Sequence, residues 1–133
     1  MDVKALYERG LALRRKMFGN PAVDGRVNAL GAFGEPLQNI INAYAYGDIW
    51  SRADLPLKSK SLAVLAITAA TNRSQEFRVH MNGALNNGCT PEEIREVLLL
   101  VALYCGIPAA NEAHRIACDV ISESNVANEK GRS

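Results

Sequence analysis

The sequence contains few of the residues on which cross-links and metal centres depend. Among its 133 residues there are two histidines and three cysteines. Cys89, Cys105 and Cys118 are odd in number, widely spaced and not arranged as a Cys-x-x-Cys pair. Disulfide frameworks and zinc sites need paired or regularly spaced cysteines. We therefore expect reduced thiols, with Cys105 and Cys118 in the core, and no metal site.

A long apolar run and a strong charge of one sign are also missing. The longest apolar stretch, residues 62–70, has about half the length that a membrane helix needs. Residues 1–4 are amphipathic, unlike the start of a signal peptide. The net charge of +1 argues against a nucleic-acid surface built on bulk positive charge. These absences predict a cytoplasmic protein that binds neither membranes nor nucleic acids.

The sequence has no glycine-rich phosphate loop and no serine in a nucleophile elbow. The first motif would point to a bound nucleotide or coenzyme, and the second to a covalent intermediate. We therefore expect that any reaction of this chain uses no cofactor.

Helical spacing is what the sequence has in abundance. Apolar residues recur at intervals of three and four, between helix start and stop signals. Thr90 and Glu93 form the pattern of a capping box around Pro91, and Gly88 and Gly106 follow expected helix ends. The pattern predicts an all-α fold, a bundle of six helices at about residues 2–17, 35–47, 58–71, 74–87, 90–105 and 108–124.

The predicted organisation is one helical domain over residues 1–124, followed by a polar, frayed tail over residues 125–133. Residues 20–34 are expected to form a connection. The helices at 58–71 and 90–105 are too apolar for one small domain to cover. We therefore expect a homo-oligomer of at least three subunits.

The helix predicted at residues 74–87 carries the strongest candidate for chemistry. Glu76 and His80 are four residues apart, which puts both side chains on one helix face at the border of the core. A carboxylate beside an imidazole favours the protonated ring, and such a pair can exchange a proton with a reacting carbon. The alternative is a surface pair that stabilises its helix by about 0.2–0.5 kcal/mol.

Trp50 and Arg52 are the notable residues of the segment that follows Gly47. A guanidinium suits a small anionic ligand such as a carboxylate, and an indole ring can form the wall of such a site. The alternatives are a tryptophan that fills the core and an arginine that is solvated. We take Arg52 and Trp50 as candidates for binding a substrate.

Several segments of the chain resemble the carboxymuconolactone decarboxylase family. They are residues 76–80 (EFRVH), 84–99 (ALNNGCTPEEIREVLL) and 104–111 (YCGIPAAN), with 7–10 (YERG), 46–52 (YGDIWSR) and 60–62 (KSL) upstream. The resemblance extends to about Val120. It implies the all-helical fold of alkyl hydroperoxidase D proteins, assembled as a ring-like homo-oligomer, a trimer or a hexamer.

The resemblance also implies a reaction. The hydroperoxidase branch carries Cys-x-x-Cys-x-x-x-His, but Arg73 and Glu76 stand at the two cysteine positions, before His80. The redox pair is absent, which argues against peroxide reduction. The decarboxylase branch implies cofactor-free loss of CO2 from 4-carboxymuconolactone, giving 3-oxoadipate enol-lactone in protocatechuate breakdown. In that reaction His80, held by Glu76, would donate the proton, and Arg52 would bind a substrate carboxylate.

The sequence departs from the decarboxylase pattern at three places. Leu100 replaces a frequent Gln or His, residues 53–55 (ADL) replace a Pro-Gly-Leu type of turn, and Tyr46 replaces a common Trp. If a polar group at position 100 serves the substrate, this chain acts on a different lactone or acid. An isomerase or hydrolase that uses the same proton chemistry also fits these residues, as does an oligomeric binding protein without enzymatic activity.

Overall fold

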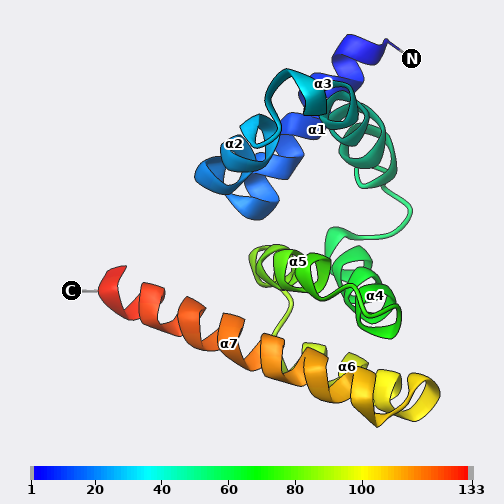
Figure 1. Cartoon of the computed structure of the whole chain (residues 1–133), viewed down its shortest axis with the longest axis vertical. Helices are drawn as coiled ribbons and strands as arrows, with labels where there is room; N and C mark the ends of the chain where they lie inside the picture. The colour runs from blue at the N-terminus through cyan, green and yellow to red at the C-terminus, as the bar shows by residue number, and fades with distance from the viewer. Residues whose placement is uncertain (1, 132–133) are drawn as a thin grey trace. The chain divides into compact units, whose positions relative to one another are not determined.

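The computed structural model describes residues 2–131, and every regular element in that range is a helix (Figure 1). The all-α prediction is confirmed. The expected count of six is corrected to seven α-helices and one π-helix among the described residues. These are α1 (Val3–Phe18), α2 (Asn20–Asn28), α3 (Gly31–Ile40), η1 (Ile41–Ile49), α4 (Leu57–Ala70), α5 (Ser74–Asn86), α6 (Pro91–Cys105) and α7 (Ile107–Gly131).

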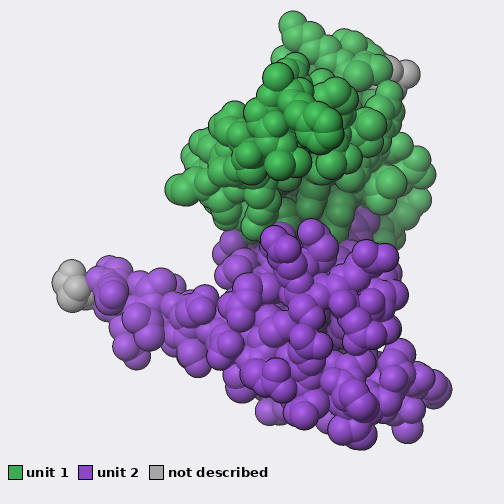
Figure 2. Space-filling model, in the orientation of Figure 1, with its two compact units in different colours: residues 1–57 green, residues 58–133 purple. Residues whose placement is uncertain are grey.

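The chain divides into two compact units, Met1–Leu57 and Lys58–Ser133, which we call unit 1 and unit 2 (Figure 2). Unit 1 contains α1, α2, α3 and η1, and unit 2 contains α5, α6, α7 and nearly all of α4. The expected single domain over residues 1–124 spans both units and stays a prediction. No helix among residues 2–131 is both long enough and apolar enough to cross a bilayer.

The strongest start signals in the sequence begin helices where expected. The side chain of Asp2 accepts a hydrogen bond from the backbone N of Lys4 at 3.1 Å and caps α1. At α6, the backbone N of Glu93 donates to Thr90 Oγ1 at 3.1 Å, and the backbone N of Thr90 donates to Glu93 Oε1 at 2.9 Å. The capping box is confirmed, and it satisfies two backbone N–H groups that the start of the helix leaves without a partner.

Two segments expected to be irregular are helical. The predicted connection at residues 20–34 contains α2 and the start of α3. Helix α2 buries only Val23, so it has no apolar stripe from which its period could be recognised. The predicted frayed tail continues α7 as far as Gly131, because residues 125–130 contain neither proline nor glycine to end the helix.

Within unit 1, α1 and η1 lie so close that only glycine fits at two positions. A Cβ added at Gly10 would lie 1.6 Å from the backbone O of Asn42, and one added at Gly47 would lie 2.1 Å from the backbone O of Leu6. The absent side chains therefore allow direct contact between the two backbones.

Unit 1 also buries polar and aromatic side chains together. Arg14 is 4% exposed, and its Nη1 donates to Gln38 Oε1 at 2.8 Å and to Asn42 Oδ1 at 3.1 Å. Its guanidinium lies 5.7 Å from the ring centroid of Tyr46, which stacks on Trp50 with a centroid distance of 5.9 Å. Hydrogen bonds and ring contacts thus accompany the apolar packing of this unit.

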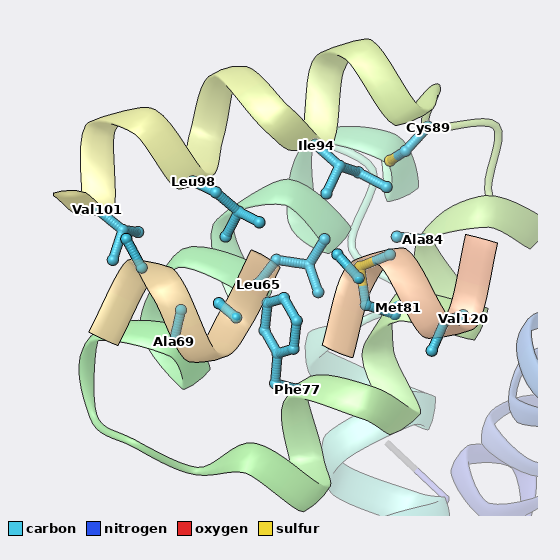
Figure 3. Close-up of a cluster of buried hydrophobic side chains, with 13 residues drawn as sticks. Leu65, Ala69, Phe77, Met81, Ala84, Cys89, Ile94, Leu98, Val101 and Val120 are labelled. Atoms are coloured by element: carbon cyan, nitrogen blue, oxygen red, sulfur yellow. The ribbon is translucent and has the colours of Figure 1, made fainter. Parts of the chain in front are cut away.

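The core of unit 2 is apolar, and its side chains come from all four helices (Figure 3). Its largest fully buried members are Leu65 of α4, Phe77 and Met81 of α5, and Ile94 and Leu98 of α6. Helix α7 packs against α5 and α6 and adds a row of small residues, Ala110, Ala113, Ala117 and Val120.

The cysteine prediction is half right. All three thiols are free, as expected, but Cys105 and Cys118 are exposed and only Cys89 is buried. Cys118 follows Ala117 directly, so it lies about 100° around α7 from that buried row. Cys105 is the last residue of α6, beyond the buried Val101.

Candidate functional site

Glu76 and His80 lie one turn apart on α5, in unit 2. His80 belongs to the buried face of the helix, together with Phe77, Met81 and Ala84, and is 8% exposed. Glu76 lies in the first turn and is exposed. The predicted spacing on one helix is confirmed, and His80 is buried more deeply than its expected place at the border of the core. The direct pairing of the carboxylate with the imidazole stays a prediction.

This arrangement is suited to proton transfer. Shelter from water removes competing solvent from around an imidazole, although burial by itself favours the neutral ring. A carboxylate one helical turn away can favour the charged form of the ring. A histidine on a rigid helix, with core residues on both sides, is also held in place more firmly than one in a loop.

Trp50 and Arg52 follow the π-helix η1 in unit 1. The backbone N of Trp50 donates to the carbonyl O of Ala45 at 2.8 Å, which continues the wider turn of that helix. Trp50 is 9% exposed and stacks on Tyr46, so most of its surface fits the alternative of a tryptophan that fills the core. Its role in substrate binding stays a prediction.

Arg52 already has a carboxylate partner. Its Nε and Nη2 donate to the two carboxylate oxygens of Asp48 at 3.0 and 3.3 Å. These hydrogen bonds lower the pKa of Asp48, as do the charges of Arg52 and Arg9. A ligand carboxylate at Arg52 would therefore compete with Asp48.

A groove of about 450 Å³ lies beside these residues, entirely within unit 1. Trp50 and Arg52 both line it, as do Leu13, Leu55 and a second cation, Arg9. The Nε and Nη2 of Arg9 donate to the backbone O of Gly47 at 2.8 and 2.6 Å. In the sequence, Arg9 stands out only as part of a segment of family resemblance, and no spacing rule connects residue 9 to residue 52.

The structure places the four predicted site residues in two groups, one in each unit. Glu76 and His80 share a helix of unit 2, and Trp50 and Arg52 share a groove of unit 1. Among residues 2–131, no three histidine, cysteine, aspartate or glutamate side chains are grouped as a metal site requires.

The departure at position 100 lies on an apolar surface. Leu100 is 57% exposed and lines a groove of about 330 Å³ between α4 and α6, with Ile67, Val97 and Tyr104 among its neighbours. None of the charged side chains of residues 2–131 lines this groove.

Comparisons with known proteins identify the family of the chain and are consistent with the all-helical fold. A model of the carboxymuconolactone decarboxylase family matches residues 35–119, well over half of the chain. The chain belongs to the carboxymuconolactone decarboxylase family.

Three relatives are similar to this chain over at least half of its length. The 4-carboxymuconolactone decarboxylase of Acinetobacter baylyi is 35% identical over 98% of this chain and 97% of its own length. The nitrosuccinic acid decarboxylase npaB of Metarhizium robertsii is 32% identical over 90% of this chain and 84% of its own length. Peroxisomal protein 2 of Schizosaccharomyces pombe is 36% identical over 53% of this chain and 35% of its own length. The expectation of an enzyme of the carboxy-lyase class is confirmed by the two relatives that are decarboxylases.

Proposed function

We propose that this chain decarboxylates 4-carboxymuconolactone to 3-oxoadipate enol-lactone, without a cofactor, in the breakdown of protocatechuate. The observation that carries the proposal is the match to the Acinetobacter enzyme, at 35% identity over nearly the full length of both chains. The buried histidine on α5 supports it, because the reaction needs one proton donor.

The substrate can supply its own electron sink. It is an unsaturated five-membered lactone whose ring carbon γ to the carbonyl bears two groups, a carboxylate and a carboxymethyl group. When the ring carboxylate leaves as CO2, its electron pair passes through the double bond to the carbonyl oxygen and forms a dienolate. The protein needs only to stabilise the dienolate and to protonate its α-carbon.

His80 is the proposed proton donor, and Glu76 supports its protonated form. Protonation of the α-carbon transfers one proton from the imidazolium and leaves a neutral ring, which regains a proton from solvent before the next cycle. Arg52 and Trp50 are the proposed residues for substrate binding.

A second candidate substrate class is favoured by a specific observation. The Metarhizium relative acts on nitrosuccinic acid, whose nitro group can accept electrons as the lactone carbonyl does. Leu100, where the decarboxylase pattern often has Gln or His, is consistent with a different small acid.

A spectrophotometric assay separates these candidates. With enzymatically prepared 4-carboxymuconolactone, turnover removes the conjugation between the double bond and the carbonyl. We expect absorbance to fall faster than without enzyme, with one CO2 released per lactone and no effect of a chelator. Release of CO2 from nitrosuccinate alone would favour the second substrate class. Conversion of neither acid would leave an isomerase, a hydrolase or a binding protein.

We also propose that the chain works as a homo-oligomer, a trimer or hexamer. Helix α6 exposes a row of large apolar side chains, Leu99, Leu100, Leu103 and Tyr104, at 51–81%. Exposed apolar patches of this kind usually mark an interaction surface. Light scattering at micromolar concentration should give at least three times the mass of one chain, and the mass of a monomer would contradict the proposal.

A further inference from the structure

The second half of helix α6 is apolar on two sides. Leu98 and Val101 point into the core of unit 2 and are almost fully buried (Figure 3). The row of exposed apolar side chains from Leu99 to Tyr104 lies on the outer side of the same helix. A helix that is apolar all round is normally buried, and the core of unit 2 covers only one side of this one. The outer side is therefore suited to a second partner.

A groove lies beside this row, so the surface has both projecting side chains and a hollow. The groove, of about 330 Å³, lies between α4 and α6, and Leu100 and Tyr104 line it. Ile67 of α4 also lines it and is 59% exposed. We call the groove, Ile67 and the row on α6 the α4–α6 face. Residues 61–72 and 97–111, from which the face is built, include no charged residue.

The exposed area of the α4–α6 face is close to what a stable contact needs. Its five large apolar side chains are each 51–81% exposed. Because an aromatic side chain can bury about 150–250 Å² and an aliphatic one somewhat less, together they present an area on the order of 600 Å². A standard interface takes about 800 Å² from each partner. The face alone therefore supplies most of one side of a stable interface.

A second copy of the same face is the partner that fits these features. Tyr104 is 81% exposed beside the groove that it lines, so each copy offers a large side chain where the other offers a hollow. Because the face has no charged residue, two copies can meet without repulsion between like charges. A contact between identical faces has two-fold symmetry, and two-fold contacts are the commonest kind in homo-oligomers.

We propose that the α4–α6 face packs against the same face of a second copy about a two-fold axis, with Tyr104 of each copy against the groove of the other. This inference rests on the proposed homo-oligomer, and it adds the surface and the symmetry of one contact. A two-fold contact joins copies in pairs. Of the two assemblies proposed above, it therefore favours the hexamer over the trimer.

A pair of charge variants tests the symmetry of this contact. If identical faces meet, Leu100→Glu and Leu100→Lys each bring like charges together, so each variant should have about half the mass of the parent assembly or less. Light scattering at micromolar concentration measures the mass. An equimolar mixture of the two variants should regain the parent mass, because opposite charges then meet. Val3→Glu is the control, since Val3 is 54% exposed on α1, outside the face, and this variant should keep the parent mass.

Cys105 provides a second readout that does not depend on mass. It is exposed and lines the groove, whereas Cys118 is exposed and does not line it. In the parent assembly, iodoacetamide should modify Cys105 at least about tenfold more slowly than Cys118, because contact with a second copy removes access to the thiol. In Leu100→Glu the two cysteines should react at similar rates.

Circular dichroism establishes that the variants are folded, and Leu103→Glu and Leu103→Lys take their place if the Leu100 variants do not fold. A folded charge variant that keeps the parent mass would overturn the inference. Dissociation of both variants without reassembly in the mixture would show that the face meets a different surface, which refutes the two-fold contact. A monomeric parent would contradict the proposed homo-oligomer as well. An oligomeric parent in which Cys105 reacts as fast as Cys118 would contradict this contact alone.

Discussion

In unit 1, helices α1 and η1 approach until backbone meets backbone, whereas in unit 2 large apolar side chains fill the space between helices. Gly10 and Gly47 make the first arrangement possible, and buried Arg14 and Asn42 lie beside it. Phe77 and Leu65 typify the second, at 1% and 0% exposure. The two units are therefore packed in different ways, unit 1 by close backbone contact and unit 2 by large apolar side chains.

This difference indicates which kind of substitution should destabilise each unit. Close backbone contact tolerates no added atom, because a backbone cannot turn aside as a side chain can. An apolar core is most sensitive to removal of atoms, because a cavity forfeits both transfer free energy and packing contacts. We therefore expect enlargement at Gly10 or Gly47 to destabilise unit 1, and truncation at Phe77 or Leu65 to destabilise unit 2.

The largest expected effect is on catalysis, at the buried histidine of unit 2. His80→Ala removes the proposed proton donor, and general acid catalysis contributes about 10²- to 10⁴-fold in rate. Initial rates with 4-carboxymuconolactone measure the loss. His114→Ala is the matched control, since His114 lies on α7 and its Nδ1 contacts the backbone O of Ala110, 2.7 Å away, in its own helix.

Glu76→Gln extends this test. It keeps the size of the side chain and removes the charge, so the rate should fall with an altered pH profile. The losses in the double variant should not add, because both residues serve one proton transfer. If folded His80→Ala stays within about threefold of the parent, below the usual range for a general acid, His80 is not the donor.

The next effect concerns the core of unit 2. Phe77→Ala should lower the free energy of unfolding by about 3–5 kcal/mol, because it leaves a cavity among residues that cannot all move to fill it. Phe33→Ala is the same change at a residue that is 92% exposed, and should alter stability by less than about 0.5 kcal/mol. Urea denaturation of both variants measures the contrast. Equal losses would show that Phe33 is covered in solution, for instance by another subunit.

A smaller loss of stability is expected in unit 1, where the substitution adds atoms instead of removing them. Gly10→Ala places a methyl group 1.6 Å from the backbone O of Asn42, so α1 and η1 must separate. Such overpacking typically costs about 1–3 kcal/mol. Gly25→Ala, in α2, meets nothing within 4 Å and should stabilise its helix by about 0.5–1 kcal/mol. Thermal unfolding should therefore shift in opposite directions, and a shift of the same sign would refute the contact.

The two units also differ in how far the sequence predicted them. In unit 2, the apolar period and the Thr90–Glu93 capping box located α5 and α6 to within two residues. The spacing of Glu76 and His80 followed from the same period. Signals of this kind are local, so they can be recognised without knowing what packs against them.

In unit 1 the determining contacts join residues far apart in the chain. Arg9 reaches Gly47, and Arg14 reaches Gln38 and Asn42, and none of these pairs has a repeat or a motif. Helix α2 has no apolar face, so its sequence is typical of a connection. The groove that contains Arg9 and Arg52 could not be predicted from the sequence for the same reason. It forms only when α1 and η1 pack together.

The smallest expected effect is a difference in cysteine reactivity. All three cysteines lie in unit 2 and therefore report on that unit alone. Cys89 is 4% exposed, its Sγ donates to the backbone O of Lys58 at 3.4 Å, and Cys118 is exposed. Burial raises the pKa of the Cys89 thiol, with a further contribution from the charge of Glu93. The thiolate is the reactive form, so both access and ionisation protect Cys89.

The raised pKa also fixes the sign of the pH dependence. Folding favours the protonated Cys89 thiol, so this contribution to stability is fully present below the ordinary thiol pKa and is lost as pH rises through the raised value. Brief alkylation with iodoacetamide, followed by peptide mass spectrometry, should modify Cys118 first and Cys89 at least about tenfold more slowly. The difference between the alkylation rates of Cys118 and Cys89 should become smaller at alkaline pH and disappear in urea. Equal rates of alkylation for the two cysteines in the folded protein at neutral pH would show that the core of unit 2 opens readily near Cys89. That result would contradict the close apolar packing described for unit 2.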